Sequence, residues 1–367
     1  MEVRRIFDLL GYQQKHYPKK SALKERDAIG WGTISTAEAM ELVEKMSAAL
    51  IKLGVEPEDI VLIYTRGSSA FGLLLIQAIL QLGATVALVG TDEPDHELKD
   101  VLAAAESKIA FVEEAADLKK LRSLATEQKY LQQVFSFYQT TEVPNLEERL
   151  VVPMAKQLVE LQTLKAAVHE DDPAFFRYAA SEKSYQTFSH KEVLSQITDL
   201  AAKLHFATNN VVISYQNPYH WLELLLLHAY LAVGAQVLFL KDRQSLLSQL
   251  AANRPCAVGS HKSQVDQLRQ ELTQLPAGAA RRQRWINVWA IRIGERFTGR
   301  DRMSLLSWVR LAMAEWWRFR HWRQKTGNRL DGIFIAEPLK TSTHNLFEAM
   351  GIPIHEQELP ARFRQGA

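Results

Sequence analysis

The chain has 367 residues, of which 47% are hydrophobic and 23% charged, a composition typical of a globular protein large enough for two lobes. Its 44 basic and 42 acidic residues give a formal net charge of +2, which singles out no charged partner. One cysteine, Cys256, excludes an intrachain disulfide, so we expect a buried structural thiol in a reducing, cytoplasmic protein. The N-terminal stretch is too short and too charged to be a signal peptide.

The first predicted helix begins at a capping box, in which Ser35 is followed three residues later by Glu38. Apolar side chains then recur at helical spacing, at Ala39, Met40, Val43, Met46 and Leu50. The aliphatic and β-branched stretches 60–64 and 108–112 are typical of buried strands. Helices alternating with such strands predict parallel sheets covered on both faces.

Two apolar runs, 70–89 and 221–240, are each long enough to be considered as membrane spans. Both contain Gly-Ala near the middle, at Gly83 and Gly234, and both are interrupted by polar residues. A buried helix, a tight turn and a buried strand explain the two runs better than a span does.

The two runs belong to an internal repeat. Residues 61–91 align without gaps on 212–242 at an offset of 151, with ten identities in 31 positions. Upstream, the capping box of Ser35 and Glu38 matches one formed by Ser189 and Glu192 at an offset of 154. Each half is therefore predicted to contain a capped helix, a strand, a helix, a Gly-Ala turn and a strand. Between the halves, 113–165 is predicted to be helical and charged.

The segment 172–192 contains a possible phosphate site. An apolar strand is predicted at 173–178, a polar loop at 179–186, and a helix after Ser189. Four side chains suited to binding phosphate lie here: Ser181, Lys183, Ser184 and Thr187. Phosphate loops normally carry glycines, because the backbone N–H groups must approach the anion closely, and this loop has none. It is a working phosphate loop, a damaged one, or an ordinary connection.

The window 281–329 is basic and aromatic, with 13 Arg or Lys residues against three acidic residues and six of the eight tryptophans. One interpretation is an interfacial membrane helix, with contacts from Trp316, Trp317, Arg318, Arg320 and Trp322. The other is a helical hairpin packed on the second lobe with its arginines in solvent. No nucleic-acid motif accompanies the charge, so no nucleic-acid partner is expected.

These patterns predict an α/β fold with two related lobes of mainly parallel sheet flanked by helices. The first lobe is expected at 1–165 and the second at 166–367, with a basic, Trp-rich helical insertion at 281–329.

The order of elements resembles the adenylate-forming, AMP-binding enzymes, in particular the long-chain fatty-acid–CoA ligases. The resemblance rests on Trp31-x-Thr33-x-Ser35, on Gly83-Ala84, on 105–112, and on the basic insertion followed by 327–330. It covers nearly the whole chain but only the N-terminal part of the family's usual length. It implies the fold of the acyl-CoA synthetase N-terminal domain and an ancestry in ATP-dependent acyl activation.

The sequence departs from this family at the motifs that carry chemistry. The Gly-rich phosphate loop is replaced by 179–186, with Glu182 inside it, and the G-G-A-P-L motif by 335–339, with Glu337. The adenine-side motif Y-G-x-T-E is replaced by 358–362. By this resemblance we expect no counterpart, within 1–367, of the ribose-binding aspartate or of the C-terminal domain with its catalytic lysine. His220 and Glu223 keep an H-x-x-E spacing, which by resemblance places them at the acyl pocket; alternatively, His220 is a packed histidine at a strand end.

The departures predict a protein without independent ligase activity and without catalytic residues or a cofactor. It would instead bind a long-chain acyl group, an anionic membrane surface or a protein partner, in the cytoplasm and peripherally at the membrane. The alternative is an active ligase subunit that uses ATP and Mg²⁺, with Lys183 in a rebuilt phosphate site and the C-terminal domain supplied by another chain.

Overall fold

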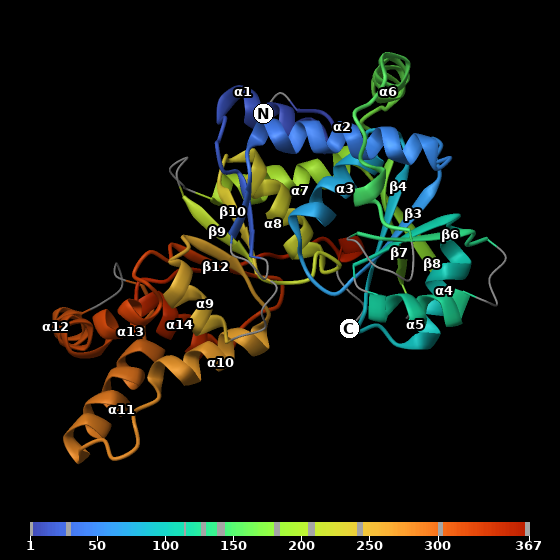
Figure 1. Ribbon diagram of the computed structural model, residues 1–367. Coiled ribbons are helices and arrows are strands. Elements are labelled where there is room, and N and C mark those ends of the chain that lie inside the picture. Colours follow the sequence, from blue (N-terminus) through green and yellow to red (C-terminus); the bar gives the residue numbers. More distant parts are fainter. Residues whose placement is uncertain are drawn as a thin grey trace. The chain divides into compact units, whose positions relative to one another are not determined.

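The chain forms two mixed, mostly parallel β-sheets flanked by helices, which confirms the predicted α/β fold (Figure 1). The structure is a computed structural model that describes residues 3–26, 31–113, 115–125, 130–137, 144–179, 184–204, 210–240, 245–299 and 304–363.

Contacts between residues divide the chain into two compact units. Unit 1 contains 1–209, 216–241 and 360–367, and unit 2 contains 210–215 and 242–359. These units are discontinuous in sequence, whereas the expected lobes were continuous ranges that met at residue 165. The difference arises because strand β7 (Pro173–Ala179), beyond that boundary, pairs in parallel with β4 (Thr85–Gly90) in unit 1.

Unit 1 is built around a six-stranded sheet with the order β6-β5-β3-β4-β7-β8, in which only the β7–β8 pair is antiparallel. A second group of strands has the order β10-β1-β2. The strands of unit 1 not yet given are β1 (Leu23–Arg26), β2 (Trp31–Ile34), β3 (Ile60–Thr65), β5 (Ile109–Val112), β6 (Gln133–Ser136), β8 (Ser184–Ser189) and β10 (Gln236–Phe239). Its helices are α1 (Asp8–His16), α2 (Thr36–Lys52), α3 (Ala70–Leu80), α4 (Asp95–Ala105), α5 (Ala115–Ala125), η1 (Glu147–Arg149), α6 (Ala155–Ala167), α7 (His190–Lys203), α8 (Trp221–Ala232) and η4 (Ala361–Phe363).

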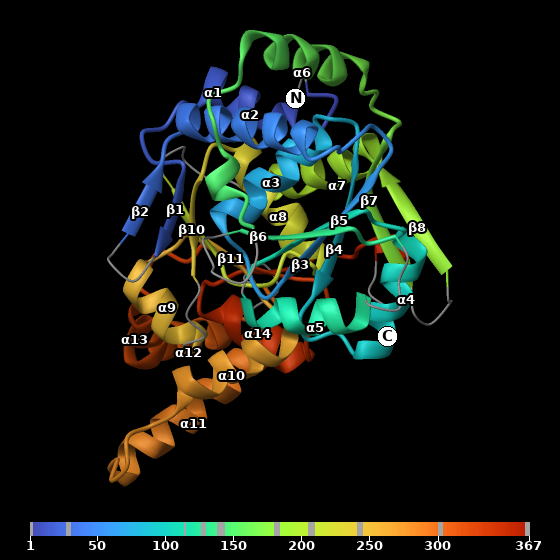
Figure 2. The ribbon, with the colours of Figure 1, turned by 45° about the vertical axis from the view of Figure 1, so that its right-hand side comes forward.

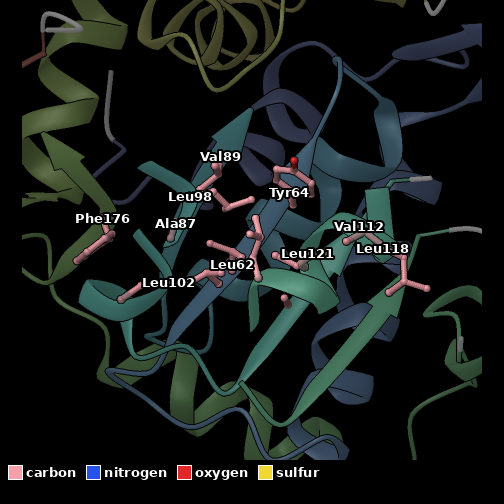
Figure 3. Packing of buried hydrophobic residues seen from close by; sticks show 13 residues of the cluster. Leu62, Tyr64, Ala87, Val89, Leu98, Leu102, Val112, Leu118, Leu121 and Phe176 are labelled. Carbon is pink, nitrogen blue, oxygen red and sulfur yellow. The ribbon is translucent and has the colours of Figure 1, made fainter. Parts of the chain in front are cut away.

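Helices α4 and α5 lie side by side on one face of the six-stranded sheet (Figures 1 and 2). Their leucines, including Leu98 and Leu121, meet alternate strand residues such as Leu62 and Tyr64 in one buried cluster (Figure 3). The residues between these, such as Ile63, face α3 and α8 instead. The period-two alternation of the strands thus supplies both faces of the core.

The structure confirms the internal repeat. The first half contains α2, β3, α3 and β4, and the second contains α7, β9 (Val211–Ser214), α8 and β10. Both predicted capping boxes are present, at Ser35 and at Ser189. In each, the serine hydroxyl oxygen accepts from the backbone N–H of the glutamate three residues later, and the serine backbone N–H donates to the carboxylate of that glutamate. Gly83 and Gly234 both end the central helix with positive φ, +77° and +68°. This left-handed conformation favours glycine.

The interpretation of 113–165 as wholly helical is wrong. Helix α5 buries Leu118, Leu121 and Leu124, but β6 follows and pairs in parallel with β5 before η1 and α6. The strand is only four residues long and half-exposed at its start, so it carries little of the apolar alternation that reveals a strand.

Unit 2 contains four parallel strands in the order β13-β12-β11-β9. Cys256 precedes β11; it is 5% exposed, and its thiol donates to the carbonyl oxygen of Val211 at 3.1 Å. The other elements of unit 2 are α9 (Leu246–Asn253), β11 (Ala257–Gly259), α10 (Lys262–Thr273), α11 (Arg281–Glu295), α12 (Leu305–Ala314), the π-helical turn η3 (Glu315–Phe319), α13 (Arg320–Lys325), β12 (Gly332–Ile335), α14 (Thr341–Ala349) and β13 (Ile354–Glu356).

The basic window is helical, as predicted, and forms α11, α12, η3 and α13. Gly294 allows α11 to pack closely in unit 2, because a Cβ there would lie 2.4 Å from Leu346 and 3.3 Å from Phe319. In both ribbon views the start of α11 extends beyond α10 and the strands of this unit. Within the described residues, no helix has both the length and the apolar character needed to cross a bilayer.

Candidate functional site

The β7–β8 hairpin occupies the place of the predicted phosphate loop. Ser181 and Lys183 lie outside the described residues. Ser184 and Thr187 lie within β8 itself, where Ser184 is opposite Ala179 and Thr187 opposite Phe176. The predicted loop 179–186 was therefore too long. Because alternate strand residues point to opposite faces, Ser184 and Thr187 cannot converge on one phosphate group.

The base of this hairpin is covered by the segment 360–363. The guanidinium of Arg362 forms an ion pair with Glu192, in the first turn of α7, and donates to the carbonyl oxygen of Thr187 at 3.2 Å. The ring of Phe363 packs 4.5 Å from that of Phe188 in β8, measured between centroids.

His220 and Glu223 both lie at the start of α8. His220 is the N-cap residue, its carbonyl oxygen accepting from the backbone N–H of Glu223 at 3.0 Å, and Glu223 is buried in the first turn. An acidic residue is favourable there because the helix N-terminus carries partial positive charge. Their role at an acyl pocket stays a prediction.

Aromatic rings fill the space beside the start of α8. Trp221 packs against Phe175 at 5.8 Å, Phe188 at 4.7 Å and Phe363 at 4.9 Å, all between ring centroids. Two adjacent cavities have volumes of only about 10 and 20 Å³. Such volumes hold about one water molecule each and no acyl chain. We call Phe175, Phe188, Trp221 and Phe363 the aromatic cluster.

A polar group that the sequence analysis missed lies next to this cluster. Arg177, in β7, hydrogen-bonds the hydroxyl of Tyr219, which donates to the carboxylate of Glu93, just after β4. The Arg177 guanidinium also lies 5.8 Å from the Tyr219 ring centroid and 5.9 Å from that of Trp221. The available signal was a charged residue, Arg177, within an otherwise apolar strand.

Burial controls the protonation of this group. It raises the pKa of Glu93, against the opposing hydrogen bond from Tyr219, and it raises the pKa of Tyr219. It lowers the pKa of Arg177, although the nearby Tyr219 and Glu93 favour the charged form. The arrangement can hold one polar group in a fixed orientation.

The neighbouring strand ends are linked by further hydrogen bonds. The amide of Asn217 donates to the carbonyl oxygen of Thr65 at 2.9 Å, and its oxygen accepts from the backbone N–H of Tyr219 at 3.0 Å. The hydroxyl of Thr65 donates to Glu113 at 3.0 Å. These residues lie at or just after the C-terminal ends of parallel strands, which is where open α/β sheets bind ligands.

In unit 2, the segment at the place of G-G-A-P-L follows β12. Ala336, Glu337 and Pro338 are exposed, and the backbone N–H of Leu339 donates to Glu356 at 3.2 Å. Glu337 is therefore solvated; its effect on nucleotide binding stays a prediction.

A larger cavity, of about 720 Å³, lies elsewhere in unit 1. One face of α1, with Asp8, Gly11, Tyr12 and Lys15, forms one wall, and residues 168–171 form the other. It lies where β7 begins, at the opposite end of that strand from the hairpin, so its volume is no evidence for the nucleotide or acyl site. No cluster of three or more His, Cys, Asp or Glu residues suited to a metal ion occurs in the described ranges.

The predicted membrane-contact residues are divided by their burial. Trp316 is 73% exposed and Arg320 is exposed, but Trp317 and Arg318 are half-buried, with Arg318 donating to the carbonyl oxygen of Gln283 at 3.1 Å. Trp322 is 1% exposed and lies in the core of unit 2, so its inclusion in a contact surface was wrong. Helical periodicity alone could not identify which side of α13 the rest of unit 2 covers.

The fold is an α/β arrangement of two mixed, mostly parallel sheets flanked by helices. The sequence matches the AMP-binding enzyme family over residues 11–355, and the chain belongs to this family. No curated protein sequence matches it.

Solved structures share the fold. The inhibitor-bound N-terminal domain of FACL13 from Mycobacterium tuberculosis has a TM-score of 0.68 and 15% identity, over 96% of this chain and 75% of that domain. A fatty acyl-CoA synthetase from the same organism has a TM-score of 0.67 and 14% identity, over 96% of this chain and 58% of that one. The luciferase-like enzyme of the mealworm Zophobas morio has a TM-score of 0.65 and 14% identity, over 95% of this chain and 71% of that one.

Proposed function

We propose that the protein is a long-chain acyl-CoA ligase-like member of the AMP-binding family that lacks independent adenylation activity. It binds an acyl group, a membrane surface or a protein partner, needs no cofactor, and works in the cytoplasm or peripherally at a membrane. The observation that carries this proposal is the packing of Arg362 and Phe363 on the β7–β8 hairpin and α8, where the family resemblance places nucleotide and acyl groups.

Charge supports the proposal. Adenylation requires a site that attracts a Mg²⁺-bound triphosphate and stabilises negative charge at the α-phosphate. Glu182 and Glu337 replace residues at which the family's backbone approaches the nucleotide. Two carboxylates there add repulsion, and a loop without glycine cannot turn its N–H groups inward at low cost.

Calorimetry with ATP and Mg²⁺, and separately with a long-chain acyl-adenylate mimic, tests the proposal. We expect no heat of binding from ATP–Mg²⁺ at millimolar concentration. Binding in the micromolar range that is lost in Lys183→Ala but kept in Lys156→Ala, an exposed lysine on α6, would refute it. That result would favour the alternative, an active subunit whose C-terminal domain is supplied by another chain.

A further inference from the structure

The exposed apolar side chains of the described residues are concentrated in one part of unit 2. Of 14 large hydrophobic side chains that are exposed, eight lie between positions 285 and 316. Five of them belong to α12, and they are Leu305, Leu306, Trp308, Val309 and Met313, with exposed fractions of 83%, 63%, 56%, 48% and 39%. Contiguous exposed apolar surface of this kind marks an interaction site.

Helix α12 has the character of an in-plane interfacial helix. Leu311 and Ala314 are buried and attach it to unit 2, while Leu305, Trp308 and Val309 recur at i, i+3 and i+4 on an exposed side. Arg310 is its only charged residue. A helix held from one side, with leucine and tryptophan on the other, can enter the headgroup–acyl boundary without crossing the bilayer.

The tryptophans beside α12 form a continuous row. Trp285 and Trp289 on α11 have ring centroids 6.4 Å apart, Trp289 lies 5.8 Å from Trp317, and Trp317 lies 6.3 Å from Trp316. The half-buried Trp289 and Trp317 support the exposed Trp285 and Trp316. The row therefore fixes the orientation of two aromatic side chains of a type enriched at membrane–water interfaces.

The charge of this region favours an anionic partner. Its two described acidic residues are already neutralised within unit 2, Glu295 by Arg269 and Glu315 by Arg323. The arginines at the start of α11, which are Arg281, Arg282 and Arg284, are exposed and form no ion pair within the described residues. The exposed arginines at the start of α11 thus add positive charge to the part of unit 2 that carries the exposed apolar side chains.

We propose that α12, with Trp285 and Trp316, is the surface by which this protein docks on an anionic lipid leaflet, and that Leu305, Leu306 and Trp308 enter the interface. The proposal rests on the membrane-binding part of the proposed function and names its residues. A second copy of the chain fits less well, because an isologous dimer would bring the same arginines face to face. An anionic leaflet supplies the opposite charge.

The test is co-sedimentation of the whole protein with phosphatidylcholine vesicles, with and without phosphatidylglycerol. We expect binding only to the anionic vesicles, and its loss as ionic strength rises past about 0.15 M. The double variant Leu305→Glu/Trp308→Glu should reduce the partition coefficient about tenfold or more, because it places charge on the inserted side. Arg281→Glu/Arg282→Glu should also reduce binding to the anionic vesicles, because it replaces two cations by carboxylates.

Matched controls lie on α6 in unit 1. Val159→Glu changes an exposed aliphatic residue and Lys156→Glu an exposed cation, and both should bind as the unsubstituted protein does. Quenching of tryptophan emission by lipids brominated on the acyl chain should weaken in Trp308→Phe. Circular dichroism of every variant separates lost binding from lost folding.

Equal binding by Leu305→Glu/Trp308→Glu and the unsubstituted protein would overturn the proposal, as would equal binding to neutral and anionic vesicles. A dimer in sedimentation equilibrium that this variant converts to a monomer would assign the surface to a second copy instead. ATP–Mg²⁺ calorimetry on the same samples keeps the two proposals separate, because vesicle binding does not depend on the nucleotide site.

Discussion

Gln77 and His228 are hydrogen-bonded to each other at the centre of unit 1, and they occupy equivalent positions of the repeat. Their side-chain Nε2 atoms lie 2.8 Å apart, and the sequence separation is 151, the offset that relates the two halves. His228 Nδ1 donates to the carbonyl oxygen of Leu224 at 2.7 Å, so its Nε2 accepts from the amide of Gln77. Both side chains are fully buried. The two central helices of the repeat thus meet at a polar contact between non-identical residues.

Removing one partner of this contact should cost more than removing both. Gln77→Leu leaves a buried ring nitrogen of His228 without its donor, and we expect it to lower the free energy of unfolding by about 1–3 kcal/mol. Adding His228→Leu should recover part of this loss, because no buried nitrogen then lacks a partner. Urea denaturation measures both effects, with Gln270→Leu, on the exposed side of α10, as control. Strictly additive losses would show that the two residues are not coupled.

The same histidine should make unit 1 sensitive to acid. Burial lowers the pKa of His228 from 6.5 to about 4, and it lowers the pKa of His190 to about 4 as well. Above pH 6.5 the histidine is neutral in both the folded and the unfolded chain, and the protein keeps its full stability. As the pH falls from 6.5 toward 4, the unfolded chain binds a proton that the folded protein does not, so this stability is lost. For His228 the loss is about 3 kcal/mol. His228→Gln should lose less stability between pH 7 and pH 4.5 than the unsubstituted protein, and an equal loss would contradict the assignment.

The two turn glycines should differ in their tolerance of a side chain. Both have positive φ, so alanine at either position should cost about 1–2 kcal/mol through backbone strain. At Gly234 the added Cβ would also lie 2.5 Å from the Cβ of Tyr17, whereas at Gly83 the nearest atom, in Val168, is 3.4 Å away. Gly234→Ala should therefore lower the melting temperature clearly more than Gly83→Ala. Equal effects would mean that Tyr17 moves aside freely.

Phe363 should limit the space that the other rings of the aromatic cluster leave open. Phe363→Ala removes a 5% exposed ring, and we expect a loss of about 3–5 kcal/mol in stability through the space left behind. If an acyl chain binds in this place, the variant should bind a long-chain acyl-adenylate mimic more tightly in calorimetry. Tyr185→Ala is the control, because that ring is 61% exposed and stacks on Phe176 in the same hairpin. Unchanged or weaker binding would place the acyl site elsewhere.

Local signals in the sequence predicted much of the fold. The capping boxes at Ser35 and Ser189, and the turns at Gly83 and Gly234, depend on residues within four positions, so a short segment fixes them. The Arg362–Glu192 pair joins residues 170 apart, and the Arg177–Tyr219–Glu93 group joins three separate strand ends. Sequence pattern carries no information on such pairings. The burial of Trp322 was missed for a similar reason, since packing within unit 2 decides which side of a basic, aromatic helix is covered.

The buried position of Cys256 makes the reactivity of its thiol a measure of local opening in unit 2. Burial raises the pKa of this thiol to about 12, so the reactive thiolate is scarce while the β9–β11 region is closed. Cys256 is the chain's only cysteine, and unit 1 contains none, so modification by a thiol reagent measures opening of unit 2 alone. Its rate follows the population of open molecules whenever reclosing is faster than labelling. The stabilities of the two units can thus be measured separately in the unsubstituted protein. Thiol modification of Cys256 measures opening of unit 2, and acid titration of His228 measures the stability of unit 1.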